Sequence, residues 1–315
     1  MLEPQPGQLI PRRVGENIWL SHPTSEQMSL ERLAGLENRE LRPEVLETEQ
    51  AIGEAMLAAL ENVARHKDGD IVMILLGGRG AQRLHQLLGE RARRGRDELI
   101  SRLHVFTQDA LAPMRMASNL SFVRDFERLL GEDFFEQVKS FTPMRTDAAD
   151  LPTLEAELSD YVQKLTARGG ADIFFLGHGP EPEDASHLAY IRAGSGAMVM
   201  DEAGLIPISS GILEHHITKF KAGGSNVNAE DEAECRRATH ILTLGPSAIL
   251  SAKCIVQSVV DASTAPAKKR TYRRVLETTL AHDPVKRAWQ LDANPGLWLR
   301  LHPNVRSLIL PDVMG

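Results

Sequence analysis

The sequence predicts an α/β protein with a single open, mostly parallel Rossmann-like sheet that carries helices on both faces. Short runs of consecutive apolar residues, such as residues 71–76, are typical of strands buried on both faces of a parallel sheet. Stretches with apolar residues at a spacing near 3.6 alternate with these runs along the chain. This alternation favours parallel strands joined by helices.

The first part of the chain predicts three kinds of segment. Residues 1–43 contain several prolines and little periodicity, so we expect an extended arm or irregular cap as an N-terminal extension. A helix is expected from Pro43 to the Asp68-Gly69-Asp70 stop, because its apolar residues have helical spacing. The strand at 71–76 follows, and then a helix through Leu84, Leu87 and Leu88.

The same alternation continues to the C-terminus. Further strands are expected at residues 103–107, 172–176, 197–200, 240–244, 254–260 and 305–310. Further helices are expected at residues 118–139 with a break near Gly131, at 151–168, from 248 onward, and at 265–280. No linker rich in Gly, Ser or Pro and no internal repeat divides the chain. We therefore expect one domain, formed by residues 44–315.

Composition and charge argue against several classes of protein. The net charge of −7 offers no overall attraction to nucleic acid or to anionic membranes. The basic clusters at residues 91–96 and at Lys268-Lys269-Arg270 are interpreted as solvated helix ends. No apolar run approaches the roughly 18 residues of a membrane span, and the N-terminus lacks the pattern of a signal peptide. Two cysteines without a metal-binding pattern fit a reducing compartment. We expect a cytoplasmic protein with no nucleic-acid or membrane partner and no cofactor.

Ligands in open parallel sheets bind beyond the carboxyl ends of the strands, which directs attention to the residues after positions 76, 107, 176 and 244. Gly77-Gly78-Arg79-Gly80 follows the first of these strands. Glycines allow close approach of the backbone to an anion, and the next helix presents unpaired N–H groups. Arg79 would add a fixed positive charge. A phosphate site and a plain strand-to-helix turn are both open interpretations of this loop.

The next two strand ends carry acid–base side chains. Asp109 follows the second strand and would be either a general base at the rim of a cleft or an ordinary cap. After the third strand, His187 stands three residues beyond Asp184, a pairing suited to acid–base chemistry. The alternative is a surface loop in which His178 and His187 form ordinary hydrogen bonds. No third ligand at a familiar spacing appears, so no metal site is predicted.

The fourth strand end, Gly245-Pro246-Ser247, is interpreted as a helix cap or as another wall of the cleft.

Taken in order, these segments resemble the glucosamine-6-phosphate isomerase/deaminase family, whose superfamily also contains 6-phosphogluconolactonases. Residues 77–80 look like the strand–TGGTP phosphate loop of the family, and residues 106–109 look like the segment that ends in its Asp-Glu-Tyr motif. Residues 175–190 resemble the G-x-G-x-D-G-H-I-A-F loop. Residues 241–252 resemble the ALTVGxGTLLDA segment, and residues 299–305 resemble the LQLHP ending. The resemblance extends from about residue 45 to the C-terminus.

The resemblance implies a modified Rossmann-like sheet and a small-molecule sugar phosphate as the ligand. By position, Asp109 would abstract the proton next to the carbonyl carbon, and His187 with its acidic partner Asp184 would assist ring opening. The implied phosphate-binding residues are Gly77, Gly78, Arg79, Gly80, Arg237 and Lys219.

Two departures from the family pattern keep three functions open. Ala185 stands where the family has an aspartate two residues before the histidine, and Arg192 stands where it has a glutamate five residues after it. The first hypothesis is a divergent isomerase or deaminase, and the second is a hydrolase similar to 6-phosphogluconolactonase. The third is a catalytically idle sugar-phosphate binder or regulatory protein. The sequence leaves the number of subunits open, a homo-oligomer included.

Overall fold

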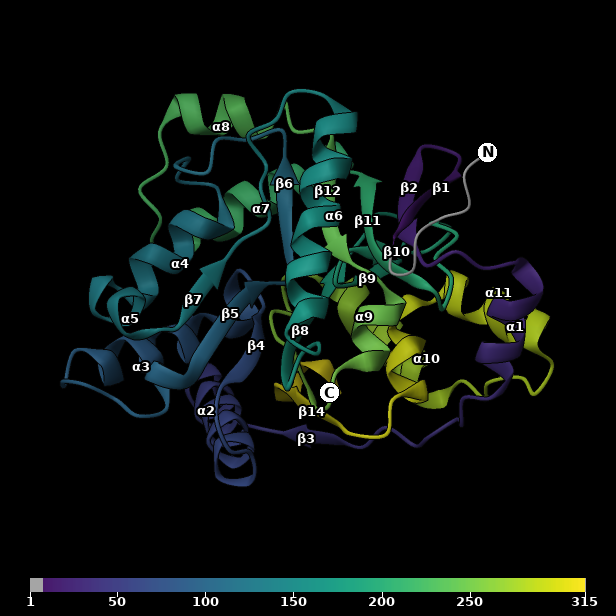
Figure 1. Cartoon of the computed structure of the whole chain (residues 1–315), viewed down its shortest axis with the longest axis horizontal. Helices are drawn as coiled ribbons and strands as arrows, with labels where there is room; N and C mark the ends of the chain where they lie inside the picture. Colours follow the sequence, from purple (N-terminus) through teal and green to yellow (C-terminus); the bar gives the residue numbers. More distant parts are fainter. Residues whose placement is uncertain (1–7, 315) are drawn as a thin grey trace.

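A computed structural model describes residues 8–314 and contains two sheets (Figure 1). The strands of the main sheet pair in parallel in the order β3-β14-β13-β8-β4-β5-β7. Their bounds are Pro43–Val45, Val305–Ile309, Ile255–Val259, Ile173–Pro180, Ile71–Leu75, Leu103–Thr107 and Ser140–Thr142, respectively. The predicted α/β class with a mostly parallel sheet is therefore confirmed.

The chain order reverses between β4 and β8. From β4 the chain continues to β5 and β7 on one side, and from β8 it continues to β13 and β14 on the other. The crossovers before and after β4 run through α2 (Glu49–His66) and α3 (Gln82–Ala92). Those before β8 and after β13 run through α6 (Leu151–Ala167) and α10 (Pro266–Glu277). Because parallel crossovers are right-handed, these two pairs of helices cover opposite faces of the sheet.

The second sheet is antiparallel and has the order β1-β2-β11-β12-β6. Its strands span Ile10–Val14, Asn17–Ser21, Asp201–Pro207, His240–Leu244 and Asp109–Ala112. A small hairpin, β9 (Ser186–Leu188) and β10 (Ile191–Arg192), extends from the end of β8. The sequence pattern did not reveal this second sheet.

The N-terminal segment belongs to the second sheet. Residues 10–34 form β1, β2 and helix α1 (Glu26–Ala34), and Figure 1 shows β1 and β2 beside β11. Trp19 is fully buried, and its indole N–H donates to the Ser195 carbonyl at 2.9 Å. The prediction of an extended arm or irregular cap is therefore wrong here. The segment pairs with a strand 180 residues away, which local periodicity cannot reveal; the part of that prediction that covers residues 1–7 lies outside the described residues.

Three further predictions need correction. Residues 197–200 form a turn before β11, because the Asp201 carboxylate accepts the Met198 N–H at 2.6 Å. The helix expected from Pro43 begins only at Glu49, where the Thr48 side chain caps α2, and residues 43–45 form edge strand β3. The strand at 240–244 exists as β12, but it lies in the antiparallel sheet.

The remaining helices complete the layers around the sheets. The expected helix at 118–139 is present as α4 and α5, with Gly131 at a φ of 78° between them. The bounds are Phe122–Leu130 for α4, Glu132–Gln137 for α5, Ser210–Ala222 for α7, Ala229–Cys235 for α8, Pro246–Ser251 for α9 and Pro284–Ala293 for α11. Short 3-10 turns span Arg79–Ala81, Ile100–Arg102, Pro295–Leu301 and Pro311–Val313.

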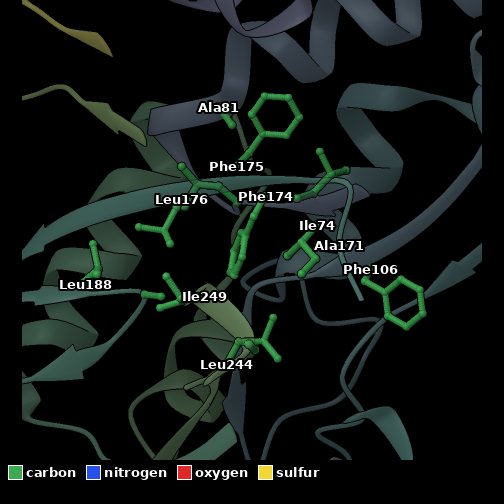
Figure 2. Packing of buried hydrophobic residues seen from close by; sticks show 14 of the residues in the cluster. Ile74, Ala81, Phe106, Ala171, Phe174, Phe175, Leu176, Leu188, Leu244 and Ile249 are labelled. Atoms are coloured by element: carbon green, nitrogen blue, oxygen red, sulfur yellow. The ribbon is translucent and has the colours of Figure 1, made fainter. Parts of the chain in front are cut away.

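A continuous apolar core joins the two sheets. Ile74, Phe106 and Phe174 are fully buried neighbours on β4, β5 and β8. Leu244 of β12 and Ile249 of α9, also buried, belong to the same cluster and lie below Phe174 in Figure 2. Close packing of these buried side chains holds the strands in place, and with them the polar residues at the strand ends. Within residues 8–314, no helix has both the length and the apolar character that crossing a bilayer requires.

Candidate active site

A pocket lies beyond the carboxyl ends of β4, β5, β8 and β13. It is centred where the chain order reverses, the usual ligand position in an open parallel sheet. Among the predicted site residues, those that line it are Gly77, Gly78, Arg79, Gly80, Asp109, His187 and Lys219. The end of β12 does not line this pocket, because β12 runs in the antiparallel sheet; Ser247 there donates a hydrogen bond to Glu202 at 2.7 Å. The end of β13 supplies the fourth wall.

The glycine loop after β4 is shaped by close packing. A Cβ on Gly77 would lie 2.2 Å from Cδ1 of Phe122, so only glycine lets the backbone pass beneath this ring. Gly78 has a φ of 74°, in the left-handed region that favours glycine. The loop then enters a short 3-10 turn at Arg79–Ala81 before α3 begins. The backbone of residues 77–80 is thereby held against the pocket.

Three cations gather on one side of the pocket around Asp261. The Lys219 ammonium lies 3.1 Å and the Arg79 guanidinium 4.0 Å from the Asp261 carboxylate. Arg79 also contacts Glu49 at 2.5 Å. Lys268 is buried, and its ammonium donates to the Val260 carbonyl at 2.9 Å. The site therefore holds a surplus of positive charge suited to an anion.

Burial and charge shift the pKa values in this cluster. Burial lowers the pKa of Lys268 to about 8, although the nearby Asp261 carboxylate opposes the change. Burial also disfavours ionisation of Asp261, but Lys268, Lys219 and Arg79 outweigh it and lower the pKa of this carboxyl. The interpretation of Lys268 as part of a solvated helix end is wrong, because α10 turns this side chain toward the pocket.

Asp109 is the first residue of β6 and is almost fully buried. Its Oδ2 accepts a hydrogen bond from the Gln108 side chain, while its Oδ1 has no partner among residues 8–314. Burial raises the pKa of Asp109 to about 7, and the Gln108 hydrogen bond only partly offsets this. A buried carboxyl that titrates near neutrality and keeps one oxygen free is suited to general-base chemistry.

His187 lies on β9 with its ring fixed from three sides. Its Nδ1 lies 2.6 Å from Oε1 of Glu181. The ring stacks on Tyr190 at 4.1 Å between centroids, with 18° between the planes. A Cβ on Gly179 would lie 1.8 Å from Nε2, so glycine is required for the ring to lie over β8.

The structure does not bring Asp184 and Arg237 to the pocket. The Asp184 carboxylate, with its side chain 38% exposed, pairs with Arg270 and Arg274 of α10. The loop turns between residues 181 and 185, which directs Glu181 rather than Asp184 toward His187. Arg237 is exposed before the start of β12, and β12 begins opposite Ala112, at the far end of β6 from Asp109.

Several pocket residues escaped the sequence analysis. Helix α7 contributes His215 and His216, and burial lowers the pKa of each imidazole to about 4. His178, considered from the sequence as an ordinary hydrogen-bonding residue of a surface loop, is buried and lines the pocket. It shares one hydrogen bond with Thr271 at 2.8 Å, and burial lowers its pKa to about 3. These imidazoles are neutral at pH 7. The rule that ligands bind beyond the carboxyl ends of parallel strands does not point to the α7 residues, because they lie on a helix.

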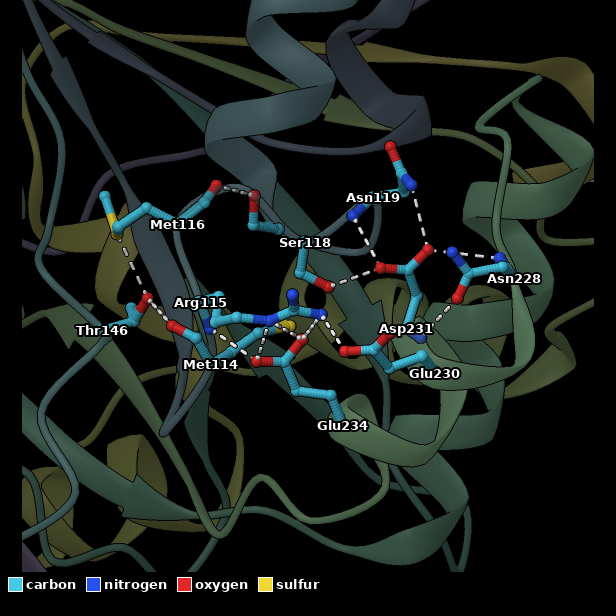
Figure 3. A network of polar contacts seen from close by, with 11 residues as sticks. Met114, Arg115, Met116, Ser118, Asn119, Thr146, Asn228, Glu230, Asp231 and Glu234 are labelled. Carbon is cyan, nitrogen blue, oxygen red and sulfur yellow. Dashed lines mark hydrogen bonds and ion pairs between the residues drawn. The ribbon is translucent and has the colours of Figure 1, made fainter.

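A polar network anchors the segment between β6 and α4 (Figure 3). Asp231 on α8 accepts a hydrogen bond from the Asn119 amide at 2.9 Å. Arg115 pairs with Glu234 at 3.0 Å and with Glu230 at 3.2 Å. This segment connects Asp109 to Phe122, so α8 helps to hold both pocket residues in place.

Comparisons with known proteins show similarity in structure but not in sequence. No family model and no curated protein matches the sequence. Among solved structures, a monomeric glucosamine-6-phosphate deaminase described as a missing link of the NagB superfamily superposes with a TM-score of 0.64 at 18% identity, covering 87% of this chain and 98% of that one. The chain has the NagB/6-phosphogluconolactonase fold.

Two 6-phosphogluconolactonases extend the comparison. The enzyme from Trypanosoma cruzi gives a TM-score of 0.62 at 14% identity, covering 89% of this chain and 97% of that one. The enzyme from Trypanosoma brucei gives 0.61 at 17% identity, covering 87% and 98%. The resemblance inferred from the ordered motifs is thus confirmed for the fold.

Proposed function

We propose that this protein is a divergent member of the glucosamine-6-phosphate deaminase and 6-phosphogluconolactonase superfamily and acts on an amino-sugar or other sugar phosphate as an isomerase or deaminase. The observation that carries the proposal is the free oxygen of Asp109. This buried carboxyl has a pKa raised to about 7 and lines the same pocket as His187 and the cation cluster. Structural neighbours that act on sugar phosphates support the same class of ligand.

The basic side of the pocket is the proposed phosphate site. The phosphate would contact the backbone of residues 77–80 and the side chains of Arg79, Lys219 and Lys268. Asp184 and Arg237 are left out of the proposed site, because neither lines the pocket. With the phosphate held there, the sugar carbons would lie within reach of Asp109 and His187, which line the same pocket.

The proposed reaction has two proton-transfer stages. His187 takes the proton of the anomeric hydroxyl and returns a proton to the ring oxygen, so the bond between C1 and the ring oxygen breaks and an open-chain aldehyde forms. Asp109 then removes the proton from C2 while the carbonyl oxygen at C1 takes up a proton, which gives an enediol or, for an amino sugar, an enolamine. Return of the proton from Asp109 to C1, with loss of a proton from the oxygen or nitrogen on C2, yields the ketose or the imine. In the amino sugar, the resulting imine at C2 is hydrolysed by water and ammonia leaves.

The test is exchange of the C2 hydrogen with solvent. Hexose phosphates and hexosamine phosphates are incubated with the protein in D2O, and deuterium at C2 is followed by mass spectrometry and NMR. The wild type is expected to incorporate deuterium, and Asp109→Asn is expected to lose this exchange by at least about 100-fold. Binding of these ligands without exchange would contradict the enzyme proposal and favour an idle binder.

A lactonase is the second candidate, favoured by the two 6-phosphogluconolactonases among the structural neighbours. Lactone hydrolysis needs no base at C2. Turnover of a phosphosugar lactone that survives Asp109→Asn, together with no C2 exchange in the wild type, would establish the hydrolase in place of the isomerase.

A further inference from the structure

The turn between β8 and β9 delivers a carboxylate to His187. The two strands pair antiparallel, with Gly179 opposite His187, and residues 181–185 connect them. The Glu181 N–H donates to the Ala185 carbonyl at 3.0 Å, which closes the turn. Glu181 Oε1 then lies 2.6 Å from Nδ1 of His187, and the two side chains are only 11% and 8% exposed. This is a buried and geometrically defined contact.

The contact sets which nitrogen of His187 carries the proton. An ionised carboxylate only accepts hydrogen bonds, so Nδ1 must be the protonated nitrogen when the ring is neutral. Nε2, next to Gly179, then keeps its lone pair. Stacking on Tyr190 holds the plane of the ring, and the contact of Nδ1 with Glu181 selects its orientation within that plane. The arrangement leaves Nε2 as the atom available for proton transfer.

Glu181 also stands in for carboxylates that the chain lacks. The positions at which the resembling family carries the acidic partners of this histidine are Ala185 and Arg192. Asp184 is engaged with Arg270. Within residues 8–314, Glu181 is the carboxylate in hydrogen-bond contact with His187.

We propose that Glu181 is the positioning residue for His187: it fixes the tautomer with Nε2 free and balances the positive charge that the imidazole acquires when Nε2 takes a proton from the substrate. The inference rests on the proposed ring-opening role of His187. It explains how a loop that has lost both expected carboxylates retains a functional histidine.

The experiment compares Glu181→Gln with Glu183→Gln. Both variants remove one negative charge from the same turn, but the Glu183 side chain is exposed. Glu181→Gln is expected to lower kcat by about 100-fold, within the range of a lost acid–base contribution, and to change KM by less than about twofold. Glu183→Gln is expected to keep wild-type kcat and KM. Equal losses of kcat in the two variants would overturn the proposal, because they would indicate an effect of loop charge.

Nitrogen-15 NMR of the histidine rings gives a readout independent of turnover. The wild type is expected to show His187 as the tautomer protonated at Nδ1, and Glu181→Gln is expected to show a mixture of tautomers, since an amide either donates or accepts. A wild-type ring protonated at Nε2, or an unchanged tautomer in Glu181→Gln, would overturn the proposal. If the wild type turns over no sugar phosphate, the proposed function fails, while the NMR result still decides the role of Glu181.

Discussion

The Gln108 side chain hydrogen-bonds to Oδ2 of Asp109, while its own amide oxygen accepts the N–H of Gly177 at 3.2 Å. One amide thus connects the end of β5 to the end of β8 and holds the Asp109 carboxyl in a fixed orientation. Because the bond reaches only Oδ2, Oδ1 stays free. An ordinary structural aspartate would have both oxygens paired.

This arrangement predicts that Asp109 destabilises the folded protein at neutral and alkaline pH. Its pKa rises from 3.8 to about 7 on folding, so the folded state binds more protons between these values and stability falls as the pH rises through this window. Asp109→Asn is expected to gain up to about 4 kcal/mol in free energy of unfolding relative to the wild type between pH 4 and pH 8. Urea denaturation at a series of pH values measures this difference.

The matched control for this experiment is Asp184→Asn. The hydrogen bond to Arg270 lowers the pKa of Asp184. Ionised Asp184 therefore stabilises the folded protein at neutral pH, and this contribution is lost as the pH falls. Its replacement is expected to give no gain in stability at pH 8. A flat difference between Asp109→Asn and the wild type across the pH range would show that Asp109 is not held in an apolar environment.

A second prediction separates Lys219 from Arg237 as phosphate ligands. Lys219 lines the pocket, whereas Arg237 is exposed beyond the far end of β6. Lys219→Ala is expected to weaken binding of inorganic phosphate by about 10-fold, close to 1.4 kcal/mol, and Arg237→Ala by less than about twofold. Isothermal titration calorimetry at low ionic strength measures both. Similar losses in the two variants would place the anion elsewhere or show only long-range attraction.

A third prediction concerns Asp261, which lies among the pocket cations with a φ of 62°. Its carboxylate competes with a bound phosphate for Lys219 and Arg79. Asp261→Asn is expected to bind inorganic phosphate several-fold more tightly at pH 6.5. Because Asp261 raises the pKa of Lys268, the variant should also lose affinity at a lower pH than the wild type, whose Lys268 titrates near 8. Weaker binding at pH 6.5 would mean that Asp261 mainly holds the cations in place.

A fourth prediction tests the packing of the glycine loop. Gly77→Ala would force Phe122 to move, and overpacking of this kind costs about 1–3 kcal/mol in free energy of unfolding. The thermal shift caused by a hexose phosphate should also decrease, because Phe122 lines the pocket. Gly35→Ala, where the nearest atom to a Cβ is 3.5 Å away, is the control and should change neither quantity appreciably.

A double-mutant cycle between Gly77 and Phe122 shows whether the clash causes the loss in free energy of unfolding. In a Phe122→Ala background, Gly77→Ala should cost clearly less than in the wild type, since the clashing ring is gone. Additive costs would indicate that the loss comes from the backbone of the loop instead.

The parallel sheet and much of the pocket could be predicted from local sequence pattern. The apolar runs at β4, β5 and β8 must be buried on both faces, and parallel strands that end together bring residues 77–80 and Asp109 to one edge. His187 followed from the same rule and from the resemblance of its loop. These inferences depend on local pattern and chain order, which a sequence contains.

Which charged residues reach the pocket could not be predicted, because it depends on how distant segments pack. Glu181 and Asp184 are both acidic residues of one turn, and the pairing of β8 with β9 directs the first to His187 while Arg270 takes the second. Lys268 is buried because α10 packs beside β8, and Trp19 is buried because β2 pairs with β11. Each outcome depends on contacts between segments far apart in the chain. A local sequence pattern does not predict which way a side chain points at such a contact.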